Sequence, residues 1–252
     1  MPEPVTLIVL PPSHFCEKAR WGLERAGVSY RQDRYAPLFN RAETRKHGGT
    51  TTPVLVTRDG AVPESTPILR WAHDQGADLY PDEDALRAEI DGMEDTLQRL
   101  GLDTRRLVYG HLLQHPSLAR KALGRELPRR RRAALTAVSP LLFAMMRKGL
   151  KIDAKGLERS RQRVDETLSG VEERLADGRR YLVGDRFTAA DLTFAAMLAP
   201  IVLPSNYGAR TLDPDERPAE FLEAMAEYRA RPAGQFALRM FADHRNERAS
   251  RA

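Results

Sequence analysis

Two side chains that could carry chemistry, Ser13 and Cys16, lie three residues apart in the segment Pro12 to Arg20. Ser13 falls just before a predicted helix, where unpaired backbone amides and the helix dipole favour an anion. A hydroxyl placed there can donate a hydrogen bond to a bound thiolate, which lowers the pKa of the thiol and increases the nucleophile available near neutral pH. The alternative is that Ser13 serves only as the N-cap of the helix, which requires the same geometry.

Cys16 is the only cysteine among the 252 residues, so an intrachain disulfide and a dithiol redox mechanism are both excluded. A lone thiol suits the reducing cytoplasm, where we expect the protein to be located. We expect Cys16 to point inward from its helix and to be an inert buried thiol. A redox mechanism that uses Cys16 as a single reactive thiol is the alternative.

Alternating strand and helix patterns, with short connections, predict a small α/β domain that positions these side chains. The predicted order is strand, helix, strand, followed by strand, strand, helix, at Val5 to Leu10, Phe15 to Ala26, Val28 to Arg34, Pro53 to Val56, Ala61 to Val62, and Thr66 to His73. The first three elements predict a parallel pair of strands with a right-handed crossover. The run Val5 to Leu10 is apolar enough for a doubly buried strand, and it lacks the basic start of a signal peptide.

Helical spacing replaces this pattern after Pro81, because apolar residues then recur every three or four positions. Such stripes, for example from Ile90 to Leu100, are typical of the core faces of helices. The segment Leu192 to Leu203 is apolar nearly all round and is predicted to be a buried central helix. We therefore predict an α/β domain at residues 1–81 and an all-helical domain at residues 84–252.

Three further motifs follow the Ser13 motif in order along the chain. They are Thr52-Pro53-Val54-Leu55, Glu64-Ser65, and, in the carboxy half, Tyr181 to Asp185 followed by Phe187 and Thr188-Ala189-Ala190-Asp191. Their order and spacing resemble the cytosolic glutathione transferase superfamily, specifically a serine-type, bacterial-like member with an enlarged helical domain. The resemblance implies a thioredoxin-like domain followed by an all-helical domain. It covers both domains and is weak between about Gly110 and Leu157.

The resemblance assigns roles to individual residues. Ser13 becomes the catalytic hydroxyl, and Thr52 pairs through its backbone with the cysteinyl part of glutathione, next to a cis Pro53. Glu64 and Ser65 hold the γ-glutamyl group, with help from free helix amides. The alternatives are an ordinary trans proline at a strand start, and a helix cap with an acid in its first turn. Glutathione is the expected cosubstrate, and no metal is expected.

The resemblance also identifies a structural motif before the predicted buried helix. Thr188 and Asp191 match a capping box in which aspartate takes the place of the usual glutamate. We expect Asp191 to be structural, and not a catalytic acid, despite its burial. The resemblance further implies a homodimer and a small electrophilic substrate that binds against the helical domain.

The net charge of +5 is modest, and the densest basic run is Arg129 to Arg132. We interpret this run as a solvated helix end and expect no nucleic-acid partner, because no aromatic side chains interleave with the arginines. The stretch Ala133 to Met146 is interrupted by Ser139 and Pro140, so no membrane span is expected. His111 and His115 are four apart and are predicted to be a solvated pair on one helix face.

Three functions remain after these exclusions. The first is a glutathione transferase that activates the thiol of glutathione for attack on a small electrophile, as in detoxification. The second is a non-catalytic glutathione-binding or interaction protein on the same fold. The third is a single-thiol redox enzyme that uses Cys16.

Overall fold

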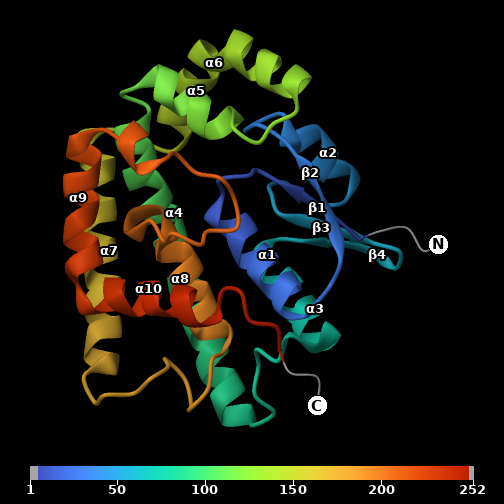
Figure 1. Cartoon of the computed structure of the whole chain (residues 1–252), viewed down its shortest axis with the longest axis vertical. Coiled ribbons are helices and arrows are strands. Elements are labelled where there is room, and N and C mark those ends of the chain that lie inside the picture. The colour runs from blue at the N-terminus through green and yellow to red at the C-terminus, as the bar shows by residue number, and fades with distance from the viewer. Residues whose placement is uncertain (1–4, 250–252) are drawn as a thin grey trace.

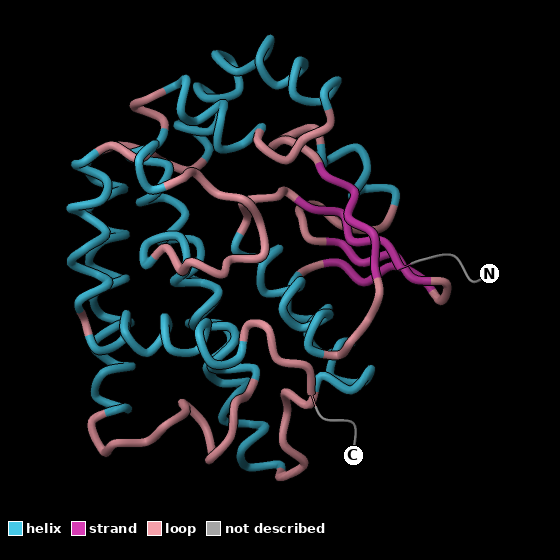
Figure 2. The backbone as a smooth tube through the Cα atoms, in the orientation of Figure 1, coloured by secondary structure: helices cyan, strands magenta, loops and turns pink. Residues whose placement is uncertain are grey.

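The computed structural model describes residues 5–249, with a four-stranded sheet on one side and helices over the remainder (Figures 1 and 2). The strands are β1 (Val5–Val9), β2 (Tyr30–Arg34), β3 (Val54–Thr57) and β4 (Gly60–Pro63). The helices near the sheet are α1 (His14–Arg25), α2 (Asn40–Lys46), α3 (Ser65–Ala72) and the short π-helix η1 (His73–Ala77). The later helices are α4 (Asp84–Leu112), α5 (Pro116–Gly124), α6 (Arg129–Gly149), α7 (Ala154–Leu175), α8 (Ala189–Val202), the 3-10 turn η2 (Pro214–Glu216), α9 (Ala219–Ala230) and α10 (Pro232–His244).

The sheet has the strand order β2-β1-β3-β4. β1 pairs in parallel with β2, and β3 runs antiparallel to both β1 and β4. Leu7 and Val9 on one face of β1 and Ile8 on the other are all buried, as expected for a doubly covered strand. Helices α1 and α3 lie between the sheet and the later helices (Figure 1). The predicted thioredoxin-like domain followed by a helical domain is confirmed, and the domain boundary near residue 82 stays a prediction.

One helix of the first domain, α2, was not predicted from the sequence. Its seven residues, NRAETRK, contain a single apolar side chain and therefore show no helical stripe. The structure instead buries two polar residues of this helix, Asn40 and Thr44, which are four positions apart. Tertiary packing, rather than a local apolar pattern, accounts for this element.

Helix α8 is the centre of the helical domain, and every residue from Ala189 to Val202 except Pro200 is buried. Its N-terminus is fixed by Asp191, whose carboxylate accepts hydrogen bonds from the Thr188 backbone at 2.8 Å and the Thr188 hydroxyl at 2.9 Å. The other carboxylate oxygen accepts the Leu182 backbone N–H at 2.7 Å. The predicted buried helix and its capping box are therefore both confirmed.

Helix α1 is tied to the carboxy-terminal part of the chain by a buried charge cluster. The Glu17 carboxylate accepts bonds from Arg20 at 3.0 Å and from Arg245 at 2.6 Å. It also accepts the backbone N–H of Gly208 at 3.0 Å. Burial disfavours ionisation of Glu17, but the two guanidinium groups outweigh it and lower its pKa. The connection between α8 and α9 is thereby held against the start of α1.

Helices α5 and α6 form a separate hydrophobic cluster at one end of the molecule's long axis (Figure 1). The cluster includes Leu123, Leu135, Leu142 and Phe143 and reaches Ala36, next to β2. This is the stretch in which the family resemblance is weak. No helix within residues 5–249 has both the length and the apolar composition needed to cross a membrane.

Candidate functional site

The loop between β1 and α1 places Ser13 at the N-cap position, with extended backbone angles of φ −72° and ψ 127°. Its backbone N–H donates to the Leu10 carbonyl at 2.9 Å, and its carbonyl accepts the Glu17 N–H at 2.9 Å. The Ser13 hydroxyl makes no capping hydrogen bond to the helix. The backbone is therefore that of an N-cap residue, whereas the hydroxyl is not used for capping.

The Cys16 thiol lies fully buried beneath Ser13. Burial raises the pKa of this thiol, and the charge of Arg20 with hydrogen bonds from Ser13 and Thr52 offsets part of the rise. Because the Ser13 and Thr52 side chains both act on the pKa of this sulfur, the loop after β1 and the loop before β3 meet at this point. A buried thiol with a raised pKa is a poor nucleophile, which disfavours redox chemistry through Cys16.

The peptide bond between Thr52 and Pro53 is cis, as the family resemblance implied. The Pro53 carbonyl accepts the backbone N–H of Glu64 at 3.1 Å. This bond joins the loop before β3 to the start of α3. Among the residues that the structure describes, none hydrogen-bonds the backbone N–H or carbonyl of Thr52. Those two groups are free to pair with the backbone of an extended peptide-like ligand.

Glu64 and Ser65 mark the start of α3, directly after β4. Glu64 has φ 70° and ψ 153°, a conformation that costs a non-glycine residue about 1–3 kcal/mol and is concentrated at functional sites. Its carboxylate is exposed, while Ser65 is only 3% exposed. Neither side chain has a hydrogen-bond partner within residues 5–249, so both can meet a ligand.

Lys18, which the sequence analysis did not single out, supports the same helix start from α1. Its ammonium is fully buried and donates to the Thr66 hydroxyl at 2.7 Å, one residue beyond Ser65. Burial lowers the pKa of Lys18 to about 8, against the opposing charge of Glu94. No local signal in the sequence points to this role, because the partner of Lys18 comes from a segment 48 residues further along the chain.

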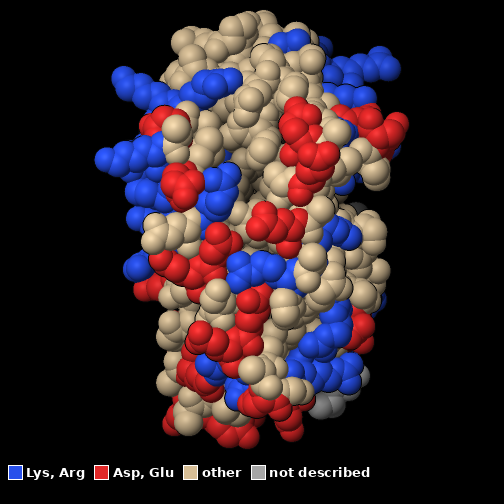
Figure 3. Space-filling model, turned by 90° about the vertical axis from the view of Figure 1, so that its left-hand side faces the viewer, with Lys and Arg blue, Asp and Glu red and all other residues tan. Residues whose placement is uncertain are grey.

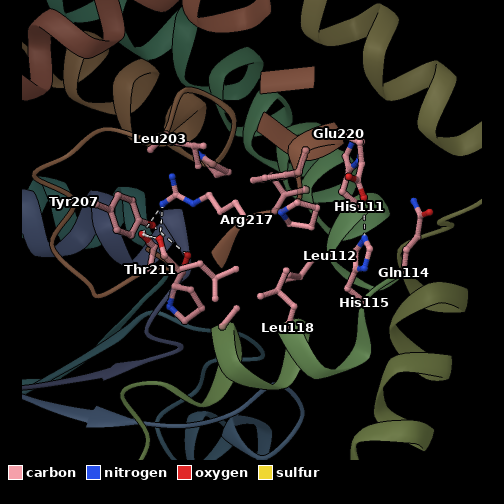
Figure 4. Close-up of a pocket in the computed structure, with 18 of the residues that line it drawn as sticks. His111, Leu112, Gln114, His115, Leu118, Leu203, Tyr207, Thr211, Arg217 and Glu220 are labelled. Atoms are coloured by element: carbon pink, nitrogen blue, oxygen red, sulfur yellow. Dashed lines mark hydrogen bonds and ion pairs between the residues drawn. The ribbon is translucent and has the colours of Figure 1, made fainter. Parts of the chain in front are cut away.

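A cavity of about 130 Å³ lies next to Pro12, between the helical domain and the loop that carries Ser13 (Figure 4). Apolar side chains form most of its wall, among them Val108, Leu112, Leu118, Leu203, Leu212 and Phe221. Tyr207 also lines the cavity, and its hydroxyl donates to the Pro12 carbonyl at 3.2 Å. The cavity therefore adjoins the residue immediately before Ser13.

Polar groups enter this cavity at two places (Figure 4). At one, the His115 ring lies 3.1 Å from the Glu220 carboxylate, beside His111. At the other, Arg217 donates to the Thr211 hydroxyl at 3.2 Å and to the Leu212 carbonyl at 2.6 Å. Burial lowers the pKa of both His111 and Arg217.

The prediction that His111 and His115 share one helix face is wrong, although the His115 side chain is 42% exposed. His111 belongs to α4, whereas His115 precedes α5, so they do not share one helix face. The segment that encloses them, near Arg217 and Glu220, comes from about a hundred residues further along the chain. The spacing of the two histidines in the sequence does not indicate that this distant segment packs against them. Within residues 5–249, no cluster of three or more metal-ligating side chains is found.

Comparison with known families agrees with this architecture. The family description "Glutathione S-transferase, N-terminal domain" matches residues 12–75, and "Glutathione S-transferase, C-terminal domain" matches residues 154–231. Together the two matches cover more than half of the chain, and the stretch containing α5 and α6 lies between them. The chain belongs to the cytosolic glutathione transferase superfamily and is a glutathione transferase-like protein.

Solved structures with the same fold share little sequence with the chain. Glutathione transferase GSTFuA3 from Phanerochaete chrysosporium aligns over 100% of both chains with 17% identity and a TM-score of 0.63. A theta class glutathione S-transferase from Xanthomonas axonopodis pv. citri, solved with glutathione bound, aligns over 94% of this chain and 98% of its own, with 22% identity and a TM-score of 0.56. The beta-etherase LigF from Sphingobium sp. strain SYK-6 aligns over 94% and 99%, with 18% identity and a TM-score of 0.57. No curated protein matches the chain in sequence.

Proposed function

We propose that the protein binds glutathione and activates its thiol for attack on a small electrophile. Ser13 donates a hydrogen bond to the thiolate, and Thr52 pairs with the cysteinyl backbone beside Pro53. Glu64 binds the γ-glutamyl ammonium, and Ser65 with the first amides of α3 binds the γ-glutamyl carboxylate. These are the positions where the superfamily places the corresponding groups.

One observation carries the proposal: polar groups from three segments converge, and several of them have no partner within residues 5–249. The Ser13 and Thr52 side chains flank the Cys16 sulfur, and the Pro53 carbonyl is bonded to the Glu64 N–H at 3.1 Å. The backbone of Thr52 and the side chains of Glu64 and Ser65 make no hydrogen bonds within residues 5–249. Polar groups that a fold leaves unpaired at one place are best explained by a ligand that pairs with them.

The reaction needs little covalent chemistry from the protein. Glutathione loses its thiol proton to solvent, and the Ser13 hydroxyl stabilises the sulfur anion that remains. The sulfur lone pair then forms a bond to an electrophilic carbon while the leaving group departs with its bonding electrons. The protein contributes orientation of the two reactants and a larger fraction of thiolate near neutral pH.

The cavity beside Pro12 supports an electrophile with an apolar body. Its wall is mainly aliphatic and aromatic, which favours a hydrophobic substrate. It adjoins the Ser13 loop through Pro12 and Tyr207, so an electrophile held there would lie close to the thiolate. We also propose a cytoplasmic homodimer with a role in detoxification, on the basis of superfamily membership.

Calorimetric titration of glutathione into the purified protein tests binding, and conjugation to an activated aryl halide tests turnover. We expect Ser13→Ala to raise the pKa of the bound thiol, read from thiolate ultraviolet absorbance. We expect it to lower the conjugation rate about 10- to 100-fold, because a hydrogen bond to a charged group contributes about 1.5–3 kcal/mol. Ser13→Thr keeps the hydroxyl and should retain a low thiol pKa, and the exposed Ser117→Ala is the matched control.

The outcomes separate the candidate functions. Unchanged activity and thiol pKa in Ser13→Ala would remove Ser13 from the mechanism. Tight glutathione binding without turnover of any electrophile or hydroperoxide would favour the non-catalytic binding protein. Failure of the wild-type protein to bind glutathione would refute the proposal as a whole.

A further inference from the structure

Helix α6 has an outer face that nothing in the described chain covers. Its inner side packs Leu135, Leu142 and Phe143 into the cluster shared with α5. On the outer side, Leu141 is 67% exposed, Met145 is 49% exposed and Val138 is 38% exposed. These three are half of the six large apolar side chains exposed within residues 5–249. Such a concentration on one helix stripe marks an interaction surface.

The ends of the same helix are strongly and uniformly basic. Between Glu126 and Asp153 the sequence has seven basic residues and no acidic residue: Arg129, Arg130, Arg131, Arg132, Arg147, Lys148 and Lys151. Figure 3 shows this end of the molecule, at the top, as a mainly uncharged surface with basic side chains near the summit and at both sides and no acidic side chain among them. The apolar stripe therefore lies between two groups of cations.

Four of these seven cations, Arg129, Arg130, Lys148 and Lys151, have no side-chain partner among residues 5–249. Arg131 bonds the Asp33 carboxylate at 2.6 Å, and Arg132 bonds backbone carbonyls that include Leu127. Arg129 and Arg130 are exposed and form no ion pair or hydrogen bond with the described residues. Cations in the first turn of a helix also oppose its dipole, and α6 has no acidic residue in that turn. Because the arginines in the first turn destabilise α6, their presence indicates an anionic partner outside the chain.

We propose that the outer face of α6 docks on an anionic lipid bilayer, with the helix axis parallel to the membrane surface. Leu141, Met145 and Val138 enter the boundary between headgroups and acyl chains, while the terminal arginines and lysines bind lipid phosphates. α6 lies at the end of the molecule's long axis, so a flat surface can reach it without meeting the rest of the fold (Figure 1). The inference is independent of the glutathione site.

The charge pattern argues against the other occupants. A second copy packed on α6 would bring basic ends against basic ends, whether the helices ran parallel or antiparallel, because both ends are basic. A nucleic acid would use the cations but not the apolar stripe between them, where no aromatic side chain is exposed for base stacking. An anionic bilayer is complementary to both the charge and the apolar stripe.

Vesicle co-sedimentation tests the proposal with phosphatidylcholine alone and with an equimolar mixture of phosphatidylcholine and phosphatidylglycerol. We expect the wild-type protein to bind the mixed vesicles, to release them in high salt, and to ignore the neutral vesicles. Replacing Arg129 and Arg130 by Gln should weaken binding about fivefold for each charge lost. Replacing Leu141 and Met145 by Gln should also weaken it, because the buried apolar area is lost.

Matched controls come from the same domain. Arg159→Gln with Arg163→Gln removes two exposed cations from α7, and Leu222→Gln removes an exposed leucine from α9. Neither should change vesicle binding. Equal losses in these controls would show adsorption by net charge or general hydrophobicity and would overturn the assignment to α6, as would absence of wild-type binding to mixed vesicles.

An insertion probe locates the contact. Because Cys16 is fully buried, a Leu141→Cys variant carries a single accessible thiol for an environment-sensitive dye. Mixed vesicles should shift its emission to shorter wavelength, whereas the same dye at Leu222→Cys should not respond. A shift that appears without vesicles as protein concentration rises, with a matching dimer in sedimentation, would contradict the bilayer and assign the face to a second copy.

Discussion

Helices α8 and α6 each contain an apolar run with an internal proline, but their surroundings are opposite. The prolines are Pro200 in α8 and Pro140 in α6. α8 is enclosed by α1, α4, α9 and α10, whereas α6 packs mainly against α5. α8 also begins with a buried acid, and α6 begins with four arginines. An apolar helix is thus a core element only where enough neighbours surround it.

The largest expected effect concerns the cap of α8. Asp191→Ala leaves the buried backbone N–H groups of Leu182 and Thr188 without an acceptor, which should lower the free energy of unfolding by about 2–6 kcal/mol. Urea unfolding of this variant should be compared with that of Asp185→Ala, an exposed acid in the same segment. A loss for Asp191→Ala no larger than for the control would show that the cap does not hold α8.

The same substitution at two leucines compares the helices directly. Leu198→Ala in α8 should destabilise the protein by about 2–5 kcal/mol, because Leu198 is fully buried and truncation leaves a cavity. Leu141→Ala in α6 should change stability by no more than about 0.5 kcal/mol, because that side chain already contacts solvent. Similar losses at both positions would mean that the outer face of α6 is covered in solution.

A pH dependence distinguishes the buried acid of α8 from ordinary carboxylates. Burial raises the pKa of Asp191 to about 6, although bonds from Leu182 and Thr188 oppose the rise. The folded state therefore binds the Asp191 proton more tightly than the unfolded state. The protonated carboxyl contributes to the free energy of unfolding below about pH 4, and this contribution is lost as the pH rises through about 6. Relative to Asp191→Asn, the wild type should lose up to about 3 kcal/mol across this interval. Parallel unfolding curves for the two proteins would indicate an unshifted carboxyl.

The smallest effect concerns the basic start of α6. Arg129→Gln and Arg130→Gln should each stabilise the protein by about 0.3–1 kcal/mol at low salt, because they remove cations from the positive end of the helix dipole. Lys148→Gln, in the last turn, should have the opposite sign. Urea titrations at low and high salt measure the stability changes of the arginine variants and of Lys148→Gln. High salt should reduce the size of each change. Destabilisation by Arg129→Gln would mean that this arginine has a partner inside the fold.

The sequence was most informative where local patterns carry the structure. Thr188 and Asp191 stand at capping-box spacing ahead of an apolar run, and both the cap and the helix were predicted correctly. The cis bond before Pro53 was implied by the family resemblance. The grouping of Ser13, Thr52 and Glu64 in one site was likewise implied by the family resemblance. Their roles toward glutathione stay predictions.

The remaining features depend on contacts between distant segments. α2 shows no apolar periodicity, so nothing local marks it as a helix. The enclosure of His111 requires the chain near Glu220 to fold over α4, which spacing within α4 does not encode. Arg131, predicted as part of a solvated run, bonds Asp33 and stacks on the ring of Tyr35 at 3.8 Å. Each case is a tertiary contact without a local signature.

The burial of Cys16 has a consequence for the protein's behaviour under oxidative conditions. A chain that holds a small thiol beside its own exposed cysteine is open to mixed-disulfide formation whenever the thiol pool becomes oxidised. Here the only sulfhydryl lies beneath the Ser13 and Thr52 side chains, with no exposed surface. The proposed site would therefore not form a mixed disulfide with its own protein, and the proposed activity would depend on the supply of reduced glutathione rather than on earlier oxidation of the protein.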